Sequence, residues 1–223
     1  MSWISVFLLS AMYVQNPVLF FDDFGDGRLR NWRRTDDSVR VLAGNLRMGK
    51  NAQHASIRII VQGSENWTDY TLELKFRMID WEERNSFDFR VRTHKGRFDI
   101  LASQLFYIFP NEQQILVLTH RPELNKDDPP IQRGEVKQHF LKRQWYLLEI
   151  NTVNNKFTFS LDGQQLLSFI DLDTPPGSVL LSLFRPASEI EIDYVRLEMP
   201  SQSVTVQEKL STTWGRIKNS WGQ

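Results

Sequence analysis

The chain has 223 residues, of which 41% are hydrophobic, including 15 Phe and 7 Trp. This content is ample for a core, and no apolar stretch is long enough to span a bilayer. The 27 basic residues balance the 27 acidic ones and Cys is absent, which argues against nucleic acid as a partner and excludes disulfides and thiolate metal sites.

The chain begins with an apolar run over residues 3–14, which has the length of a signal-peptide h-region. No Lys or Arg precedes it, and no small-residue cleavage site follows. Residues 1–16 therefore have two open interpretations, either a signal peptide or a first strand or disordered start of the chain. The first interpretation predicts an exported, extracytoplasmic protein.

Residues 17–199 are expected to form one domain of short strands. Runs rich in Val, Ile, Phe, Tyr and Thr alternate with period two and are bounded by Gly, Asn, Asp or Pro, and helical periodicity is absent. The pattern predicts an all-β, two-sheet antiparallel sandwich. The expected strands are 17–24, 38–42, 45–48, 55–62, 70–79, 86–93, 97–102, 105–109, 114–120, 135–140, 145–153, 156–162, 165–170, 178–184 and 189–198.

Tight-turn sequences join several of these strands. Ala43-Gly44, Asn154-Asn155 and Asp162-Gly163 suit residues with positive φ, so we expect antiparallel hairpins there. The polar residues 121–134, with two adjacent prolines, are expected to form a long surface loop that is either unstructured or part of a binding site.

Two consecutive strands, 70–79 and 86–93, direct apolar residues to the core and charged residues outward. These two adjacent strands are therefore expected to expose one charged ladder. This ladder is either a solvated set of paired charges or the floor of a polar ligand groove. The outward residues are Glu73, Lys75, Arg77, Asp88, Arg90 and Arg92.

A groove of this kind suits a neutral sugar, because sugars are held by hydrogen-bonding forks beside an aromatic platform. Trp81 is the aromatic candidate, although it also suits a loop packed over a sheet edge. The expected glycan-binding residues are Arg77, Trp81, Asp88, Arg90 and Arg92.

The last strand changes the face of its apolar residues midway. Ile190 and Ile192 share one face, whereas Val195 and Leu197 share the other. A β-bulge near Asp193 would bring both pairs to the core.

After Pro200 the strand pattern stops, and residues 200–223 are expected to form a linker and a tail. Leu210, Trp214, Ile217 and Trp221 fall on one face of an amphipathic helix. The tail is either disordered or a short anchor that docks on a protein or a membrane surface.

Several motifs together resemble the concanavalin A-like jelly rolls, in particular the domain family named for 3-keto-disaccharide hydrolases, and more loosely laminin G-like and family 16 glycoside hydrolase-like modules. The resemblance covers residues 18–198. It implies a jelly roll, often found on exported bacterial proteins that handle carbohydrate. The motifs are FFDDFGDG with Trp32, ENWTDYTLELKFRM, QWYLLEI, KFTFSLDG, PPGSVLLSLF and EIEIDYVRLE.

The resemblance also implies a structural Ca²⁺ between the first and last strands. The expected ligands are Asp22, Asp23, Asp26 and Asp193, whose alternative role is to cap turns or bind Arg. No organic cofactor is expected, because the chain has neither a phosphate loop nor a dinucleotide fingerprint.

Three functions follow from these observations. The preferred one is a carbohydrate-binding module without a clear catalytic constellation. The alternatives are a hydrolase or lyase acting on 3-keto-glycosides, with Glu73, Asp88 or His94 as the base, and a structural adhesion domain. Hydrolysis of the family 16 type is disfavoured, because Glu189, Glu191 and Asp193 have a different order and place from the Glu-x-Asp-x-Glu strand of that family.

Overall fold

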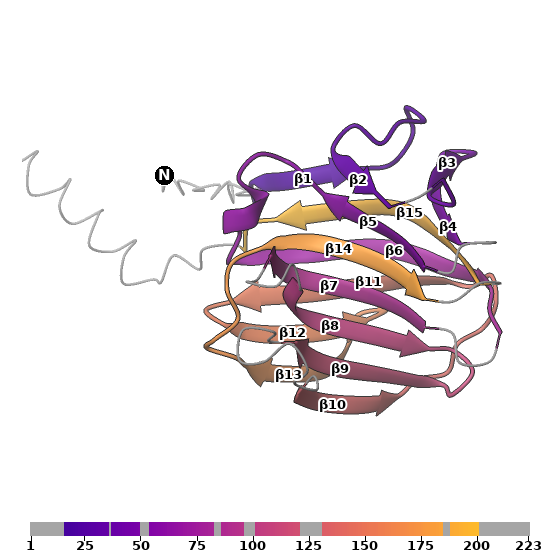
Figure 1. The fold of residues 1–223 in the computed structure, drawn as a ribbon. Helices are drawn as coiled ribbons and strands as arrows, with labels where there is room; N and C mark the ends of the chain where they lie inside the picture. Colours follow the sequence, from indigo (N-terminus) through magenta and orange to yellow (C-terminus); the bar gives the residue numbers. More distant parts are fainter. Residues whose placement is uncertain are drawn as a thin grey trace, which may run out of the picture. The chain divides into compact units, whose positions relative to one another are not determined.

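The computed structural model describes residues 16–35, 37–49, 54–82, 86–95, 101–120, 131–184 and 188–200. The strands described below all belong to one compact unit, Pro17–Met199 (Figure 1). The whole N-terminal apolar run and nearly all of the C-terminal tail lie outside the described residues, so the signal peptide, the extracytoplasmic location and the docking tail stay predictions. No described helix has the length and apolar character needed to cross a bilayer.

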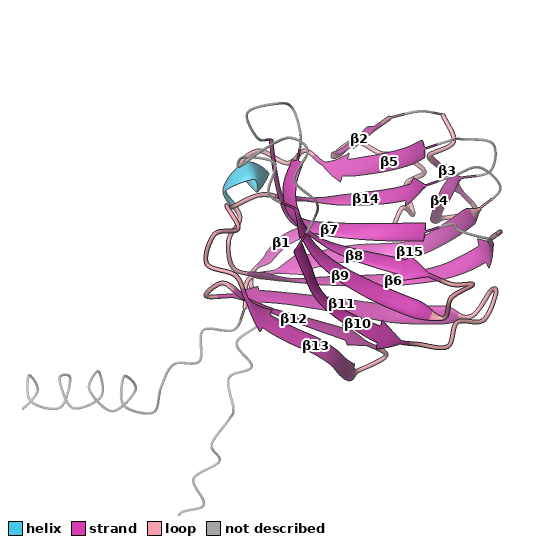
Figure 2. Cartoon of the chain, turned by 60° about the horizontal axis from the view of Figure 1, so that its bottom comes forward, coloured by secondary structure: helices cyan, strands magenta, loops and turns pink. Residues whose placement is uncertain are grey.

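Strands account for nearly all of the regular structure, with one short 3₁₀ helix, η1, at Ser64–Asn66 (Figure 2). The strands are β1 (Val18–Asp22), β2 (Trp32–Arg34), β3 (Arg40–Leu42), β4 (Asn45–Gly49), β5 (His54–Ile59), β6 (Tyr70–Asp80), β7 (Ser86–Lys95), β8 (Leu101–Phe109), β9 (Gln114–His120), β10 (Ile131–Lys137), β11 (Trp145–Val153), β12 (Lys156–Leu161), β13 (Gln164–Ile170), β14 (Ser178–Phe184) and β15 (Glu189–Glu198).

The strands form two sheets, called sheet A and sheet B below. Sheet A has the order β13-β12-β11-β6-β15-β4-β3, and β1 also pairs with β15. Sheet B has the order β10-β9-β8-β7-β14-β5-β2 and lies in front of sheet A in Figure 1. All of the described pairings are antiparallel. The two-sheet antiparallel sandwich expected from the sequence is therefore confirmed.

The core lies between the inner faces of the sheets. Rings from opposite sheets meet there: Phe76 and Phe89 have centroids 5.3 Å apart, and Phe106 and Phe159 stack at 4.6 Å. Aromatic pairs of this kind add stability beyond the area that they bury.

The tight turns have the backbone that their sequences predict. Asn154 and Asn155 have φ of 49° and 60°, and Asp162 and Gly163 have φ of 50° and 78°. Two consecutive positive φ values define the turn that matches the twist of a hairpin. These turns join β11 to β12 and β12 to β13.

The bulge expected near Asp193 is present. The register of β15 on β6 shifts between Ile192 and Tyr194. As a result Ile190, Ile192, Val195 and Leu197 are all buried in the core. The irregular backbone reverses the alternation midway, which is how one strand presents two apolar pairs of opposite parity to the same interior.

Some elements differ from the expectation. A single strand, β8, replaces the end of the expected strand 97–102 and all of 105–109, and β2 and η1 were not expected. β10 begins at Ile131, inside the expected loop 121–134. The sequence of β10 within this loop does not alternate between apolar and polar residues, so it did not predict a strand there. The strand forms by pairing with β9, where Ile131 lies opposite Thr119.

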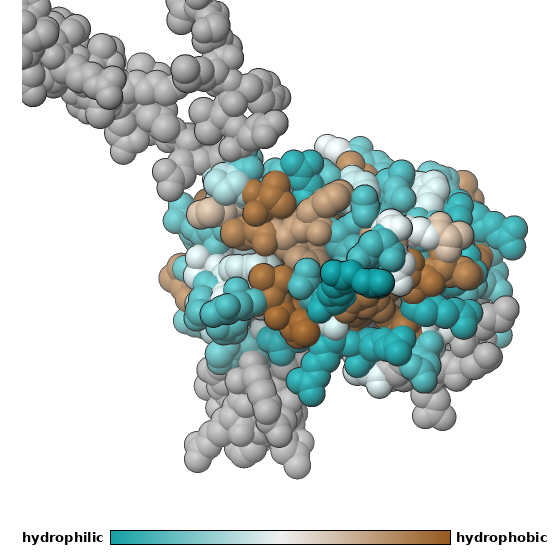
Figure 3. Space-filling view, turned by 90° about the horizontal axis from the view of Figure 1, so that it is seen from above, coloured by the Kyte–Doolittle hydropathy of each residue, from teal (hydrophilic) through white to brown (hydrophobic). Residues whose placement is uncertain are grey.

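The two ends of the unit lie side by side, because β1 pairs with β15 and the amide of Met199 donates to Pro17 O at 2.9 Å. The outer side of β1 exposes about half of Val18 and Phe21. Seen from above, apolar side chains gather among hydrophilic ones (Figure 3).

Candidate functional site

The best candidate site lies on the outer face of sheet B and begins with an ion pair on β7. Phe87, Phe89 and Val91 point into the core, as predicted, so Asp88 and Arg90 point outward. Arg90 Nε donates to Asp88 Oδ2 at 2.6 Å. The Asp88 side chain is fully buried and that of Arg90 is only 12% exposed. A charge-assisted bond in such surroundings fixes both side chains firmly.

Two aromatic side chains of β8 lie beside this pair. Tyr107 is opposite Asp88 in the ladder, and its ring stacks on that of Phe109 with centroids 5.9 Å apart. Burial, and then the negative charge of Asp88, raise the pKa of Tyr107, so its hydroxyl remains protonated at neutral pH. The result is an aromatic platform with a polar end.

Two serines continue the row on the other side of Asp88. Ser182 of β14 lies between Asp88 of β7 and Ser56 of β5 in the ladder. Both serines are buried although they point away from the core, and Ser182 Oγ has no hydrogen-bond partner among the described residues. A buried hydroxyl of this kind retains unused hydrogen-bonding capacity.

We call Ser56, Asp88, Arg90, Tyr107 and Ser182 the sheet B patch. Its hydroxyls, charged fork and aromatic ring are the groups that hold sugars. Asp88 is the only carboxylate among its residues. Glycoside hydrolysis by the common mechanisms uses two carboxyls at a fixed separation, so the patch suits binding better than hydrolysis.

The expected charged ladder on two neighbouring strands is wrong. β6 pairs with β11 and β15 in sheet A, whereas β7 pairs with β8 and β14 in sheet B. Arg77 therefore lies on the opposite outer face from Asp88 and Arg90. Period-two alternation identifies the outward residues of a strand, but it does not say to which sheet the strand belongs.

On the outer face of sheet A, Glu191 is held by two arginines. Arg47 and Arg77 each bond one of its carboxylate oxygens, and its side chain is only 2% exposed. Burial alone would raise the pKa of Glu191, but the hydrogen bonds from Arg47 and Arg77 outweigh it and lower the pKa. A carboxylate held in this way is a poor general acid.

The neighbouring charges on this face are also paired. Lys75 Nζ lies 2.7 Å from Asp193 Oδ2, and the Tyr194 hydroxyl donates to Glu73 Oε1 at 2.8 Å. Arg77 and Lys75 lie over the Trp145 ring, 4.5 and 5.1 Å from its centroid. Of the two interpretations of the charged ladder, a set of paired charges or the floor of a ligand groove, the first fits the residues of sheet A.

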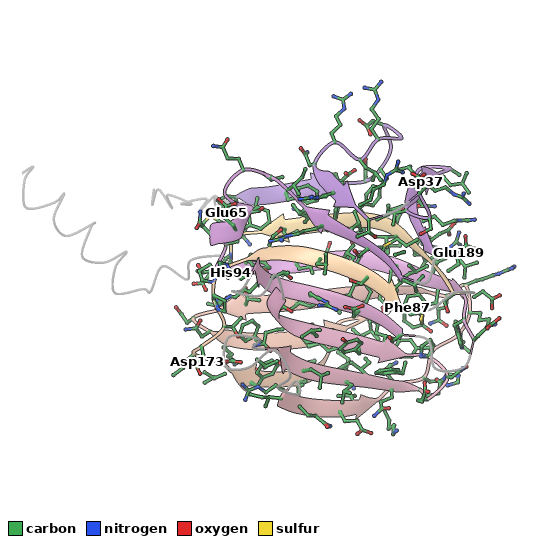
Figure 4. All side chains as sticks on the ribbon, in the orientation of Figure 1. Asp37, Glu65, Phe87, His94, Asp173 and Glu189 are labelled. Carbon is green, nitrogen blue, oxygen red and sulfur yellow. The ribbon has the colours of Figure 1, made fainter. Side chains whose placement is uncertain are left out.

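The three proposed bases do not form one constellation. Glu73 belongs to sheet A, whereas Asp88 and His94 belong to β7 of sheet B. Six residues separate Asp88 from His94, about 20 Å along an extended strand. Figure 4 shows His94 at the other end of β7 from Phe87, the neighbour of Asp88.

Trp81 covers an end of the sandwich and is not part of the sheet B patch. Its Nε1 donates to Asn111 Oδ1 at 3.0 Å, and Lys142 Nζ lies 5.1 Å from its ring centroid. The aromatic platform comes instead from Tyr107 and Phe109. The sequence feature that could have identified these two residues is the alternation in 105–109. Phe106 and Ile108 point inward there, so Tyr107 and Phe109 point outward.

Arg92 is buried, contrary to its expected outward position. A bulge in β7 between Val91 and His94 gives Arg92 a φ of 48° and turns its side chain inward. Its guanidinium bonds Thr68 O at 2.8 Å and Asn155 Oδ1 at 2.6 Å. Arg92 therefore links the two sheets and is not available to a ligand.

The four aspartates proposed for calcium are not brought together. The described residues contain no group of three acidic, His or Cys side chains able to hold a metal. Asp193 pairs with Lys75, as noted above. The other three, Asp22, Asp23 and Asp26, accept hydrogen bonds from Phe24, Gly25 and Arg28 amides, and Asp22 also accepts one from Trp32 Nε1. Their geometry fits turn capping and does not fit a shared calcium site.

Sequence comparison finds no matching protein-family model and no matching curated protein. Solved structures do match. A structure from work on endo-acting O-glycanases, which prominent members of the human gut microbiota express to initiate mucin breakdown, has a TM-score of 0.64 at 13% identity, over 82% of this chain and 99% of that one.

Two proteins of Bacillus subtilis are similar as well. The carbohydrate-binding module CBM66 has a TM-score of 0.59 at 14% identity, over 75% of this chain and 95% of the module. A protein of unknown function with a galectin-like fold has a TM-score of 0.64 at 10% identity, over 84% and 98% of the two chains. At these identities the similarity shows the fold, a galectin-like jelly roll.

Proposed function

We propose that this jelly-roll domain binds carbohydrate on the outer face of sheet B. The observation that carries the proposal is the Tyr107 ring directly opposite the Asp88–Arg90 pair. A sugar ring stacks its apolar face on such an aromatic surface while its hydroxyls bond the charged fork. The galectin-like fold, shared with a carbohydrate-binding module, supports the proposal.

Glycan-array binding followed by titration calorimetry tests this function. Tyr107→Ala removes the platform, and we expect the affinity for the best array ligand to fall about tenfold or more, as for a central aromatic contact. Trp145→Ala is the matched control, because it removes an aromatic residue from the outer face of sheet A. Equal affinities for the two variants would place the site elsewhere, and no binding to any glycan would favour an adhesion domain.

A second proposal is a specific enzymatic activity: the domain acts on 3-keto-glycosides as a hydrolase or lyase. The observation that favours it is the fully buried carboxylate of Asp88 on the proposed ligand face. Product formation from a 3-keto-glycoside that Asp88→Asn abolishes would support this reaction. Binding without turnover in the unchanged protein would exclude it.

A further inference from the structure

A row of arginines runs across the outer face of sheet B. Arg33 of β2 lies opposite Arg58 of β5, which lies opposite Leu180 of β14, and Leu180 lies opposite Arg90 of β7. The neighbours of Arg33 and Arg58 along their strands, Trp32, Ile57 and Ile59, are all buried in the core. The three guanidiniums thus extend from the same outer face.

Two members of this row have no acidic side chain in contact among the described residues. Arg58 bonds a backbone oxygen, Thr93 O, at 3.1 Å, and Arg33 is exposed without a hydrogen bond or ion pair to any described residue. Burial, and then repulsion from Arg33, lower the pKa of Arg58, while Glu65 acts weakly in the opposite sense. Two like charges face each other across adjacent strands, an arrangement that costs stability.

The outer face of sheet A uses its arginines differently. Arg47 and Arg77 there share the carboxylate of Glu191. On sheet B, Asp88 is paired with Arg90, and this leaves the positive charges of Arg33 and Arg58 without an acid in contact. An anion between Arg33 and Arg58 would relieve their repulsion, and guanidinium groups match the planar geometry of carboxylate and the oxygens of sulfate.

We propose that the glycan bound by sheet B is an acidic oligosaccharide, whose carboxylate or sulfate group lies between Arg33 and Arg58 while a neighbouring sugar stacks on Tyr107. This inference rests on the proposed carbohydrate-binding function and replaces the neutral sugar expected from the sequence with an acidic one. Arg58 and Tyr107 are three strand spacings apart and offset by two residues along the strands, about 16 Å in all, so the ligand spans more than one sugar unit.

The experiment uses matched pairs of probes. One pair is an oligogalacturonide and its methyl ester, and the other is a sulfated galactan oligosaccharide and its desulfated form. We expect the acidic member of at least one pair to bind more tightly, with an affinity that falls as salt rises. The pair that discriminates identifies carboxylate or sulfate as the group recognised.

Variants then locate the anion. Arg33→Gln changes an exposed side chain, so the fold is expected to remain intact, and the affinity for the acidic probe should fall about tenfold, as for one charge-assisted contact. Arg33→Gln with Arg58→Gln should remove the discrimination between the members of a pair. Arg40→Gln, on an exposed residue of sheet A, is the control and should bind like the unchanged protein.

The outcomes separate this inference from the proposed function. Equal or tighter binding of the neutral members, with a loss on Tyr107→Ala, would overturn the acidic ligand and keep carbohydrate binding. Acidic preference that survives both arginine substitutions would overturn the assignment to Arg33 and Arg58. Absence of binding to all probes and to the glycan array would overturn both proposals.

Discussion

On the outer face of sheet A, the charged side chains pair with one another: Glu191 lies between two arginines, Asp193 bonds Lys75 and Glu73 accepts from Tyr194, although Arg47 Nε is buried without a hydrogen-bond partner. On the outer face of sheet B, Ser182 Oγ has no hydrogen-bond partner among the described residues, and none of them places an acid in contact with Arg33 or Arg58. The two faces carry similar residue types. The difference teaches that the pairing of the charges, and not the charge content, distinguishes the proposed ligand face from the outer face of sheet A.

The largest effect that sharpens this comparison is expected at Glu191. Glu191→Ala leaves Arg47 and Arg77 facing each other, and we expect the free energy of unfolding in urea to fall by about 3 kcal/mol, as when one partner of a buried pair is removed. Glycan binding should not change. Asp193→Ala breaks a more exposed pair and should cost less than about 1 kcal/mol. Equal losses would mean that the Glu191 cluster is no stronger than a surface ion pair.

The hydrogen bond between Tyr194 and Glu73 predicts a pH effect. Burial and this bond raise the pKa of Tyr194 to about 12 from an ordinary value of 10.0. Between these values the folded chain retains a proton that the unfolded chain has lost, so stability falls as pH rises through this window. Tyr194→Phe should make that fall shallower and remove a component with a pKa of about 12 from an absorbance titration of tyrosinate. An unchanged titration would contradict the assignment.

A smaller effect is expected at Ser182. Because its hydroxyl is buried without a partner, Ser182→Ala should leave the melting temperature unchanged or slightly higher, within about 0.5 kcal/mol of stability. The same substitution should weaken glycan binding only if the ligand displaces the groups that bury this hydroxyl. A clear loss of stability in calorimetry would show that the hydroxyl is already satisfied and would remove the contrast with Glu191.

The smallest expected effect concerns calcium. Since Asp22, Asp23 and Asp26 already accept amide hydrogen bonds, we expect the same melting temperature in EDTA and in excess Ca²⁺. An ion that binds only the folded state would raise it. A rise that Asp22→Asn abolishes would establish the site that the sequence predicted.

Much of the fold was readable from local patterns. The reversal of parity between Ile192 and Val195 predicted the bulge in β15, and Asn154-Asn155 predicted a hairpin. Both signals are local, because alternation and positive φ are properties of a few adjacent residues.

The site was only partly readable. Asp88 and Arg90 were predicted correctly as outward residues, but their assignment to one ladder with Arg77 needed the long-range pairing of β6 and β7, which alternation does not encode. Arg92 has the same parity as Arg90, and only a bulge that depends on tertiary contacts turned it inward. Tyr107 was not considered, because outward residues were assigned only for strands 70–79 and 86–93.

The bond between Met199 and Pro17 has a consequence for engineering. Because the polypeptide enters and leaves the sandwich at neighbouring points, a short linker from Met199 to Pro17 would close the backbone into a ring. New termini opened at the turn between β12 and β13, where Asp162 and Gly163 lie at the surface, would then give a circular permutant with every strand pairing intact. The sandwich can likewise be spliced into a surface loop of a host protein without forcing that loop apart.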